Sequence, residues 1–173
     1  FDKLWRTFPH TTLLASGEAV GLPPNAPGNS EAGHLNIGAG RIVHQDISLI
    51  DQEIVDGAFR NNKVIDEAVL HAKKNNSSIH LIGLLSETGT HSHVRHLFAL
   101  LRYMKEVSFY KVFIHLITDG RDSDPMDGIE LGTKVLDEVN KIGVGKIVSL
   151  AGRFFAMDRD NRWERVLAAY NLY

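Results

Sequence analysis

The chain has 173 residues, of which 43% are hydrophobic, and a formal net charge of -2 at pH 7. This length accommodates one large domain or one domain with part of a second, and the hydrophobic fraction is enough to build a buried core. A nearly neutral chain has no bulk attraction to nucleic acid or to an anionic membrane surface. The absence of cysteine excludes disulfides, thiol nucleophiles and thiolate metal sites, which fits a reducing cytoplasm.

No apolar run approaches the roughly 20 residues that span a bilayer. We therefore expect a soluble, cytoplasmic protein with a small-molecule ligand, and with neither nucleic acid nor a membrane as a partner. The chain opens on Phe1 without an initiating Met and stops at Tyr173 inside an apparent helix. Neither end resembles a natural domain boundary, so we expect a fragment of a longer protein.

Two regions of the chain differ in composition. Residues 1–45 are rich in Gly, Pro and Asn, whereas a regular pattern of apolar residues begins further along. This contrast predicts part of one domain at 1–45, a connection or hinge with a short helix at 46–61, and part of a second domain at 62–173.

Apolar residues in the second region alternate between helical spacing and short continuous runs. The continuous runs predict a buried strand at 79–85 and further strands at 112–117 and 147–151. Helical spacing predicts helices that contain residues 64–72, 97–104, 131–142 and 163–170. Strands that alternate with helices of this length predict a three-layer α/β fold, a parallel sheet with helices on both faces.

Several details of these helices follow from single residues. The first helix is expected to place Val64, Ala68 and Ala72 on one apolar face, with Ile65 and Val69 beside them. Gly143 is expected to end the third helix, because glycine readily adopts the left-handed cap conformation. Asn161 and Glu164 have the spacing of a capping box at the start of the last helix.

A serine at position 30 stands among small and polar residues, in the order Asn-Ser-Glu-Ala-Gly-His. The neighbouring glycines allow the backbone to approach a bulky anion. A serine hydroxyl is a weak nucleophile unless a base or a metal lowers its pKa. Alternatively, Ser30 caps a helix with Glu31 adding negative charge to the first turn, and His34 binds a buried backbone carbonyl.

Polar motifs follow each predicted strand at its carboxyl end, at residues 86–93, 119–122 and 152–160. Ligands of open α/β sheets bind at this edge. The motifs contain His91, Arg121, Asp122, Arg153 and Arg159, and the planar fork of arginine matches carboxylate and phosphate groups. The sequence therefore predicts a site for a small, multiply anionic, hydroxylated ligand.

Each of these motifs also has a purely structural interpretation. His91 and His93 could ligate a metal, but we expect one to bind ligand or move a proton and the other to cap the following helix. Residues 119–122 could form an ordinary turn with a surface ion pair. Arg153 and Arg159 could be salt-bridged surface residues that contribute little to folding.

The motifs together resemble those of the cofactor-independent phosphoglycerate mutases. The matching segments follow the family's order and spacing over essentially the whole chain, at residues 28–41, 83–86, 91–93, 119–122, 152–153 and 158–163. Two departures are visible, since Ala32 replaces the usual Val and residues 87–90 replace the usual Asp-Gly-Gly-Val. The second departure could reshape the loop that carries His91.

The resemblance implies a longer protein with two domains. One is a metal-binding α/β domain resembling alkaline phosphatase, of which residues 1–45 would be a strip, and the other is an inserted transferase domain that begins in residues 62–173. By resemblance, Ser30 is the catalytic nucleophile and a ligand of one of two Mn²⁺ ions, whose other ligands lie outside this chain. His91, Arg121, Asp122, Arg153 and Arg159 would bind the substrate.

The implied activity is the interconversion of 3-phosphoglycerate and 2-phosphoglycerate through a phosphoserine intermediate, in glycolysis and gluconeogenesis. The resemblance further implies a monomeric enzyme that does not require 2,3-bisphosphoglycerate, and a fragment that is inactive by itself. One alternative is a metal-dependent phosphatase or phosphopentomutase of the alkaline phosphatase superfamily, which is not expected to match the arginine-bearing loops. The other alternative is a non-catalytic α/β module that binds phosphorylated metabolites.

Overall fold

The computed structural model describes all 173 residues, which form two compact units, Phe1–Gln52 and Glu53–Tyr173. The boundary between the units falls inside residues 46–61, the segment expected to connect two domains. The assignment of the units to phosphatase and transferase domains stays a prediction. None of the helices is long and apolar enough to cross a membrane.

The first unit contains short helices joined by loops. They are α1 (Asp2–Thr7), η1 (Gly17–Val20), α2 (Ser30–Ala39) and most of α3 (Asp46–Asp56). A small core packs Val20, Leu22 and Ala32 together. Asn36 ties this core to its surroundings, because its Nδ2 donates to the carbonyl of Val20 (3.1 Å) and its Oδ1 accepts from the backbone N–H of Val43 (2.9 Å).

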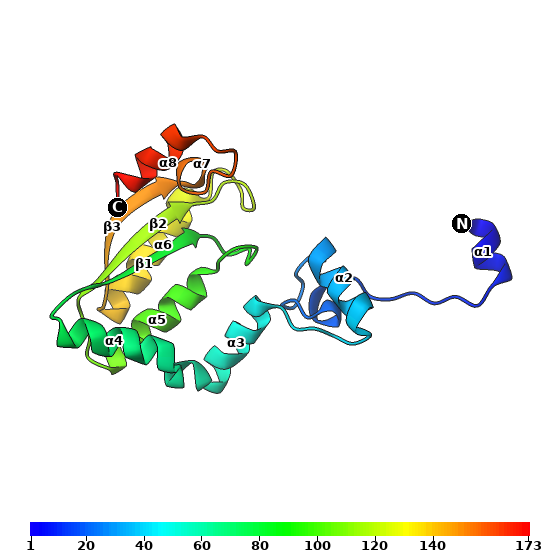
Figure 1. Cartoon of the computed structure of the whole chain (residues 1–173), viewed down its shortest axis with the longest axis horizontal. Coiled ribbons are helices and arrows are strands. Elements are labelled where there is room, and N and C mark those ends of the chain that lie inside the picture. The colour runs from blue at the N-terminus through cyan, green and yellow to red at the C-terminus, as the bar shows by residue number, and fades with distance from the viewer. The chain divides into compact units, whose positions relative to one another are not determined.

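The second unit is built on a parallel sheet of three strands, seen at its centre in Figure 1. The strands are β1 (Ile79–Leu85), β2 (Val112–Thr118) and β3 (Lys146–Gly152), in the order β1-β2-β3. The strands and the parallel pairing confirm the sequence prediction. The expectation that the strand at 79–85 is buried is wrong, because β1 is an edge strand and Ile82 is 58% exposed.

Helices precede, connect and follow the strands. They are η2 (Ala58–Asn61), α4 (Lys63–Lys74), α5 (Val94–Glu106), α6 (Gly128–Ile142), α7 (Arg153–Ala156) and α8 (Trp163–Tyr170). Buried residues of α4, α5 and α6 share one core with Val112, Ile114 and Leu116 of β2. On the opposite face of β2, His115 meets the ring of Tyr173 just after α8. Structure therefore flanks both faces of the sheet, as a three-layer α/β fold requires.

The helix details differ in their outcome. Gly143 ends α6 with φ 79°, as predicted. The apolar face predicted for α4 is right for Val69 and Ala72, which are buried, and wrong for Val64, which is 75% exposed, and for Ala68, which is also exposed. The capping box of α8 is also wrong: Arg162 occupies the cap position without a side-chain cap hydrogen bond.

Candidate functional site

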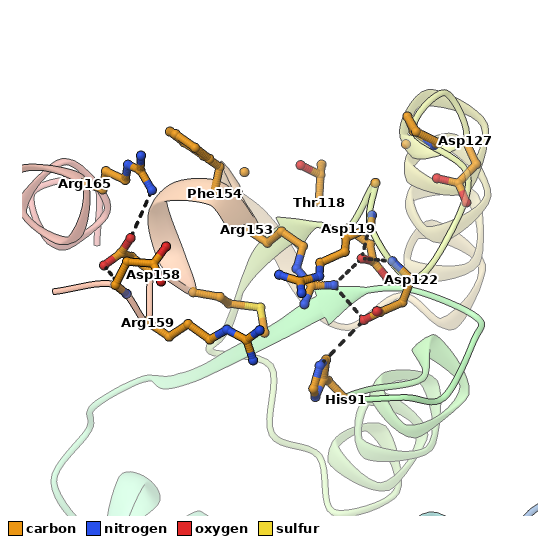
Figure 2. A pocket seen from close by; sticks show the side chains of 17 residues that line it. His91, Thr118, Asp119, Asp122, Asp127, Arg153, Phe154, Asp158, Arg159 and Arg165 are labelled. Atoms are coloured by element: carbon orange, nitrogen blue, oxygen red, sulfur yellow. Dashed lines mark hydrogen bonds and ion pairs between the residues drawn. The ribbon is translucent and has the colours of Figure 1, made fainter. Parts of the chain in front are cut away.

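A cleft of about 650 Å³ lies at the carboxyl edge of the sheet. Its lining includes all five residues that the sequence assigned to substrate binding, namely His91, Arg121, Asp122, Arg153 and Arg159. Figure 2 shows side chains from three separate loops facing this cleft. The parallel strands bring the loops together, because their carboxyl ends meet at one edge.

The loop after β2 is organised by Asp119, whose side chain is fully buried. Its Oδ1 accepts hydrogen bonds from the backbone N–H groups of Arg121 (3.2 Å) and Asp122 (3.0 Å). Gly120, the residue between Asp119 and Arg121, has φ +66°, a backbone conformation that residues with a Cβ rarely adopt. Asp119 therefore closes a tight turn that displays the next two residues along the cleft.

Arg153 begins α7 and is held between two carboxylates. Its Nη1 lies 2.5 Å from Oδ1 of Asp119 and 2.7 Å from Oδ2 of Asp122, and its side chain is only 13% exposed. The hydrogen bond to Asp122, with that to Asp119, raises the pKa of Arg153 although burial acts to lower it. Arg153 is thus a largely buried cation as well as a cleft residue: the ion pairs of the structural interpretation are present, but the side chain does not lie on the surface.

The pKa of Asp119 reflects the same contacts. Burial acts to raise it, but hydrogen bonds from the backbone N–H of Asp122, the Arg153 guanidinium, the Ser86 hydroxyl and the backbone N–H of Arg121 together lower it below its usual value. The second carboxylate oxygen, Oδ2, is buried and has no hydrogen-bond partner of good geometry. Asp119 is therefore a charged group inside the protein, stabilised mainly through one of its two oxygens.

Arg121 and Arg159 present a different situation from Arg153. Both are exposed, both line the cleft, and neither guanidinium group takes part in the ion pairs of the chain. In Figure 2 the Arg159 side chain extends into the space between the loops. These two arginines keep their hydrogen-bond donors available for an anionic ligand.

The loop that carries Arg159 is fixed by Asp158, whose side chain is 1% exposed. Its Oδ2 accepts from the backbone N–H groups of Asp160 (3.2 Å) and Arg162 (2.9 Å), and its Oδ1 lies 3.2 Å from Nη1 of Arg165. The bond to Arg162 is the largest cause that lowers the pKa of Asp158. The capping box is missing because α8 begins at Trp163 and Asn161 has φ 59°, not the extended backbone of a cap residue.

Asp119 and Asp158 are the functional residues that sequence reasoning missed. Each precedes a site arginine by one or two residues, and each accepts backbone N–H bonds from the residues that follow it. An aspartate that bonds the backbone two residues ahead is the usual start of an Asx turn. That local signal was present in the sequence, but the arginine partners of the two carboxylates were not visible there.

The two histidines of the loop after β1 divide their roles. His93 is the cap of α5, and its Nδ1 accepts from the backbone N–H of Arg95 (3.2 Å), which confirms that one histidine caps the helix. His91 is half-exposed and lies with Nε2 3.7 Å from Oδ2 of Asp122. The Asp122 carboxylate therefore sits between the His91 ring and the Arg153 guanidinium, as Figure 2 shows.

The loop at residues 87–90, which departs from the family pattern, is ordered by hydroxyl groups. The Oγ atoms of Ser86 and Thr88 lie 3.0 Å apart, and the Thr88 hydroxyl reaches that of Thr90 (3.4 Å). Glu87 turns outward to an ion pair with Lys134 on α6 (2.5 Å). Residues 87–90 thus form local hydrogen bonds in the segment directly before His91.

Ser30 belongs to the first unit and is the exposed first residue of α2. Asn29, not Ser30, caps the helix, because its Oδ1 accepts from the N–H of Ala32 (2.8 Å). His34 Nδ1 lies 2.7 Å from the Ser30 carbonyl oxygen and 3.3 Å from Ser30 Oγ. The expectation that His34 binds a buried carbonyl is wrong, since both residues are exposed.

A glycine just before the helix shapes the approach to Ser30. A Cβ at Gly28 would lie 1.8 Å from the carbonyl oxygen of Ala15, so only glycine allows the two backbone segments to pass there. Nothing lies within 4 Å of a Cβ built at Gly33. The Ser30 hydroxyl is therefore displayed at the start of a helix whose adjoining surface is open.

The side chains around Ser30 do not by themselves fit a divalent metal ion. The chain contains no group of three or more His, Asp or Glu side chains that could hold one. A hydroxyl and one imidazole fall short of the six or more oxygen ligands, or four nitrogen and oxygen ligands, that protein metal sites use.

The fold and the cleft define a class of protein, an α/β ligand-binding protein whose parallel sheet presents unpaired arginines and an Asp–His pair at its carboxyl edge. Residues 50–173 match the family described as "BPG-independent PGAM N-terminus". The chain belongs to this family, the N-terminal part of the bisphosphoglycerate-independent phosphoglycerate mutases, which confirms the resemblance.

Individual relatives agree with this family. A 2,3-bisphosphoglycerate-independent phosphoglycerate mutase of Clostridium perfringens (strain SM101 / Type A) is 51% identical over 171 residues, which are 99% of this chain and 33% of the relative. The enzyme of the same name from Nostoc sp. (strain PCC 7120) is 47% identical over 171 residues, 99% of this chain and 32% of the relative. The chain thus spans about a third of the length of the curated relatives that it matches.

A solved structure also matches, a crystal structure of Leishmania mexicana phosphoglycerate mutase at low cobalt concentration. It is 31% identical, with a TM-score of 0.79 over 98% of this chain and 32% of that chain. These relatives favour a phosphoglycerate mutase over the alternatives of a phosphatase, a phosphopentomutase or a non-catalytic binding module.

Proposed function

We propose that the complete protein interconverts 3-phosphoglycerate and 2-phosphoglycerate and does not require 2,3-bisphosphoglycerate. The observation that carries this proposal is the pair of exposed, unpaired arginines, Arg121 and Arg159, beside the Asp122–His91 pair in one cleft. A phosphoglycerate carries a carboxylate, a phosphate and a hydroxyl group. Two guanidinium groups suit the anions, and a carboxylate with an imidazole suits the hydroxyl.

The proposed mechanism uses Ser30 as the nucleophile. Its Oγ forms a bond to phosphorus while the ester bond to one glycerate oxygen breaks, which leaves a phosphoserine and a bound glycerate. The glycerate then accepts the phosphoryl group on its other hydroxyl, and Ser30 is released. Arg121, Arg159 and the donors of Arg153 not used by carboxylates hold the glycerate, while His91 and Asp122 exchange protons with its hydroxyl groups.

We further propose the features that the family resemblance implies for the complete protein. These are two Mn²⁺ ions with Ser30 as one ligand and the others outside this chain, and an alkaline phosphatase-like domain that includes residues 1–45. They also include a transferase domain that begins in residues 62–173, joined through a hinge at 46–61. A monomeric enzyme of cytoplasmic glycolysis and gluconeogenesis, with phosphoglycerate as its only partner, completes the proposal.

The decisive experiment replaces Ser30 by alanine in the complete protein. We expect Ser30→Ala to abolish both the interconversion of the two phosphoglycerates, measured without 2,3-bisphosphoglycerate, and the formation of phosphoenzyme. Ser77→Ala is the matched control, because Ser77 lies between α4 and β1 in the second unit and outside the cleft, and it should keep full activity. A Ser30→Ala variant with activity within tenfold of the unchanged protein would contradict the assignment.

A further inference from the structure

The buried carboxylate of Asp119 has no role in the proposed mechanism. It nevertheless accepts hydrogen bonds from Arg153 and from the backbone of Arg121 and Asp122, three residues that do have a role. We propose that Asp119 is a positioning residue that sets the geometry of Arg153 and of the turn bearing Arg121 and Asp122. This inference rests on the proposed function, because it concerns the same cleft.

One oxygen atom gathers the contacts. Oδ1 of Asp119 accepts from the backbone N–H groups of Arg121 (3.2 Å) and Asp122 (3.0 Å) and from Nη1 of Arg153 (2.5 Å). These donors come from two different elements, the turn after β2 and the start of α7. A single carboxylate therefore fixes the distance between the turn and Arg153.

The bridge also determines what Arg153 can do. Its Nη1 is shared between Asp119 and Asp122, so one positive charge faces two negative charges. Arg153 is thereby held in place beside Asp122, while Arg121 and Arg159 remain free to bind anions. If Asp119 were neutral, Arg153 would pair with Asp122 alone and could turn into the cleft, which would displace the carboxylate that faces His91.

Substitution by asparagine isolates the charge from the shape. The Oδ1 of asparagine can still accept the two backbone N–H bonds, so the turn keeps its closure. The amide nitrogen of asparagine would take the place of Oδ2, an atom without a well-aligned partner. The buried Ser86 hydroxyl, which interacts with Asp119, can accept a hydrogen bond as well as donate one. Asp119→Asn therefore removes the negative charge that attracts Arg153, with little change in packing.

The expected result is weaker substrate binding. When the site is not preorganised, part of the binding free energy is used to order it as the ligand binds. We therefore expect Asp119→Asn to raise KM about tenfold, and to raise the Kd for 3-phosphoglycerate, measured by calorimetry, by the same factor. Partial unfolding alone would lower kcat through the active fraction and leave KM unchanged. Asp124→Asn is the control, because Asp124 lies in the same loop and accepts a backbone N–H from Met126 (2.8 Å) but does not line the cleft.

A double-mutant cycle tests whether Asp119 acts through Arg153. If it does, adding Asp119→Asn to Arg153→Ala should change KM less than about twofold, since the shared partner is already absent. Independent, additive effects would overturn the inference, as would a single variant with the KM of the unchanged protein. A complete protein that neither binds nor interconverts phosphoglycerates would instead refute the proposed function, so the two failures are distinguishable.

A measurement on the unchanged protein covers the case in which a variant does not fold. In complete protein labelled with ¹⁵N-arginine, the clamped guanidinium of Arg153 should rotate slowly and show separate Nη signals. Arg121 and Arg159 should show averaged signals in the absence of ligand. An averaged Arg153 signal would contradict the inference.

Discussion

The removal of Arg153 should destabilise the protein far more than the removal of either neighbouring arginine. Arg153→Ala deletes two charge-assisted hydrogen bonds, one to Asp119, whose side chain is fully buried, and one to Asp122, whose side chain is 21% exposed. Water can replace the lost partner of Asp122, whereas the side chain of Asp119 is fully buried and loses its ion-pair partner. The change therefore leaves one uncompensated charge inside the protein.

The magnitude follows from these contacts. Breaking a buried ion pair by removing one partner costs about 3–5 kcal/mol. Asp119 keeps the two backbone N–H bonds from Arg121 and Asp122, so we expect a loss smaller than this range, about 2–3 kcal/mol, close to one hydrogen bond to a charged group. The loss should appear above about pH 4 and fade below it, because the lowered pKa of Asp119 means that acid removes this charge pair from the folded protein.

The free energy of unfolding, measured by urea titration at neutral pH, tests this value. Arg102→Ala is the control, because Arg102 lies 2.5 Å from Glu138 but is 57% exposed, and an exposed pair is worth about 0–1 kcal/mol. Adding Asp119→Asn to Arg153→Ala should recover part of the loss, since it removes the unpaired charge. A loss below about 0.5 kcal/mol in Arg153→Ala, the range of ordinary surface substitutions, would refute the reasoning.

Two further predictions concern activity and alkaline stability. In the complete protein, Arg121→Ala and Arg159→Ala should each lower kcat/KM by about ten- to a hundredfold, with poor rescue by lysine, and unchanged kinetics would remove these residues from the substrate site. Burial, with the hydrogen bond to Asp66 and the charge of that residue, raises the pKa of Tyr103 to about 12 from 10.0. The unfolded chain therefore ionises at Tyr103 at lower pH than the folded protein, and stability should fall by up to about 3 kcal/mol between about pH 10 and 12. Urea titrations across this range should show the decline in the unchanged protein, and an equal decline in Tyr103→Phe would assign it to other groups.

The secondary structure was largely predictable because it depends on short-range patterns. The stripe Leu131, Val135, Val139 and Ile142 is buried along α6 as its spacing indicated, and Gly143 ends the helix. The three strands also fall where continuous apolar runs placed them. Exposure was less predictable, because Val64 has helical spacing like Val69 but faces away from the core.

The sequence by itself determined the fold class, the edge of the sheet where polar residues collect, and the family to which the chain belongs. Alternating strands and helices imply parallel strands whose carboxyl ends lie at one edge, so residues 86–93, 119–122 and 152–160 were expected at that edge without coordinates. Family membership rested on motifs whose order and spacing are present in the chain itself.

Only the tertiary structure distinguished the three arginines of the cleft. In the sequence Arg121, Arg153 and Arg159 are equivalent donors, each beside an aspartate or near one. In the folded chain Arg153 is clamped by Asp119 and Asp122, whereas Arg121 and Arg159 form no ion pair. The difference arises because Asp119 and Arg153 are 34 residues apart in the chain and meet only where two parallel strands end side by side. Local sequence patterns carry no information about such a contact, since the energy of a buried ion pair depends on which groups share the same water-free space.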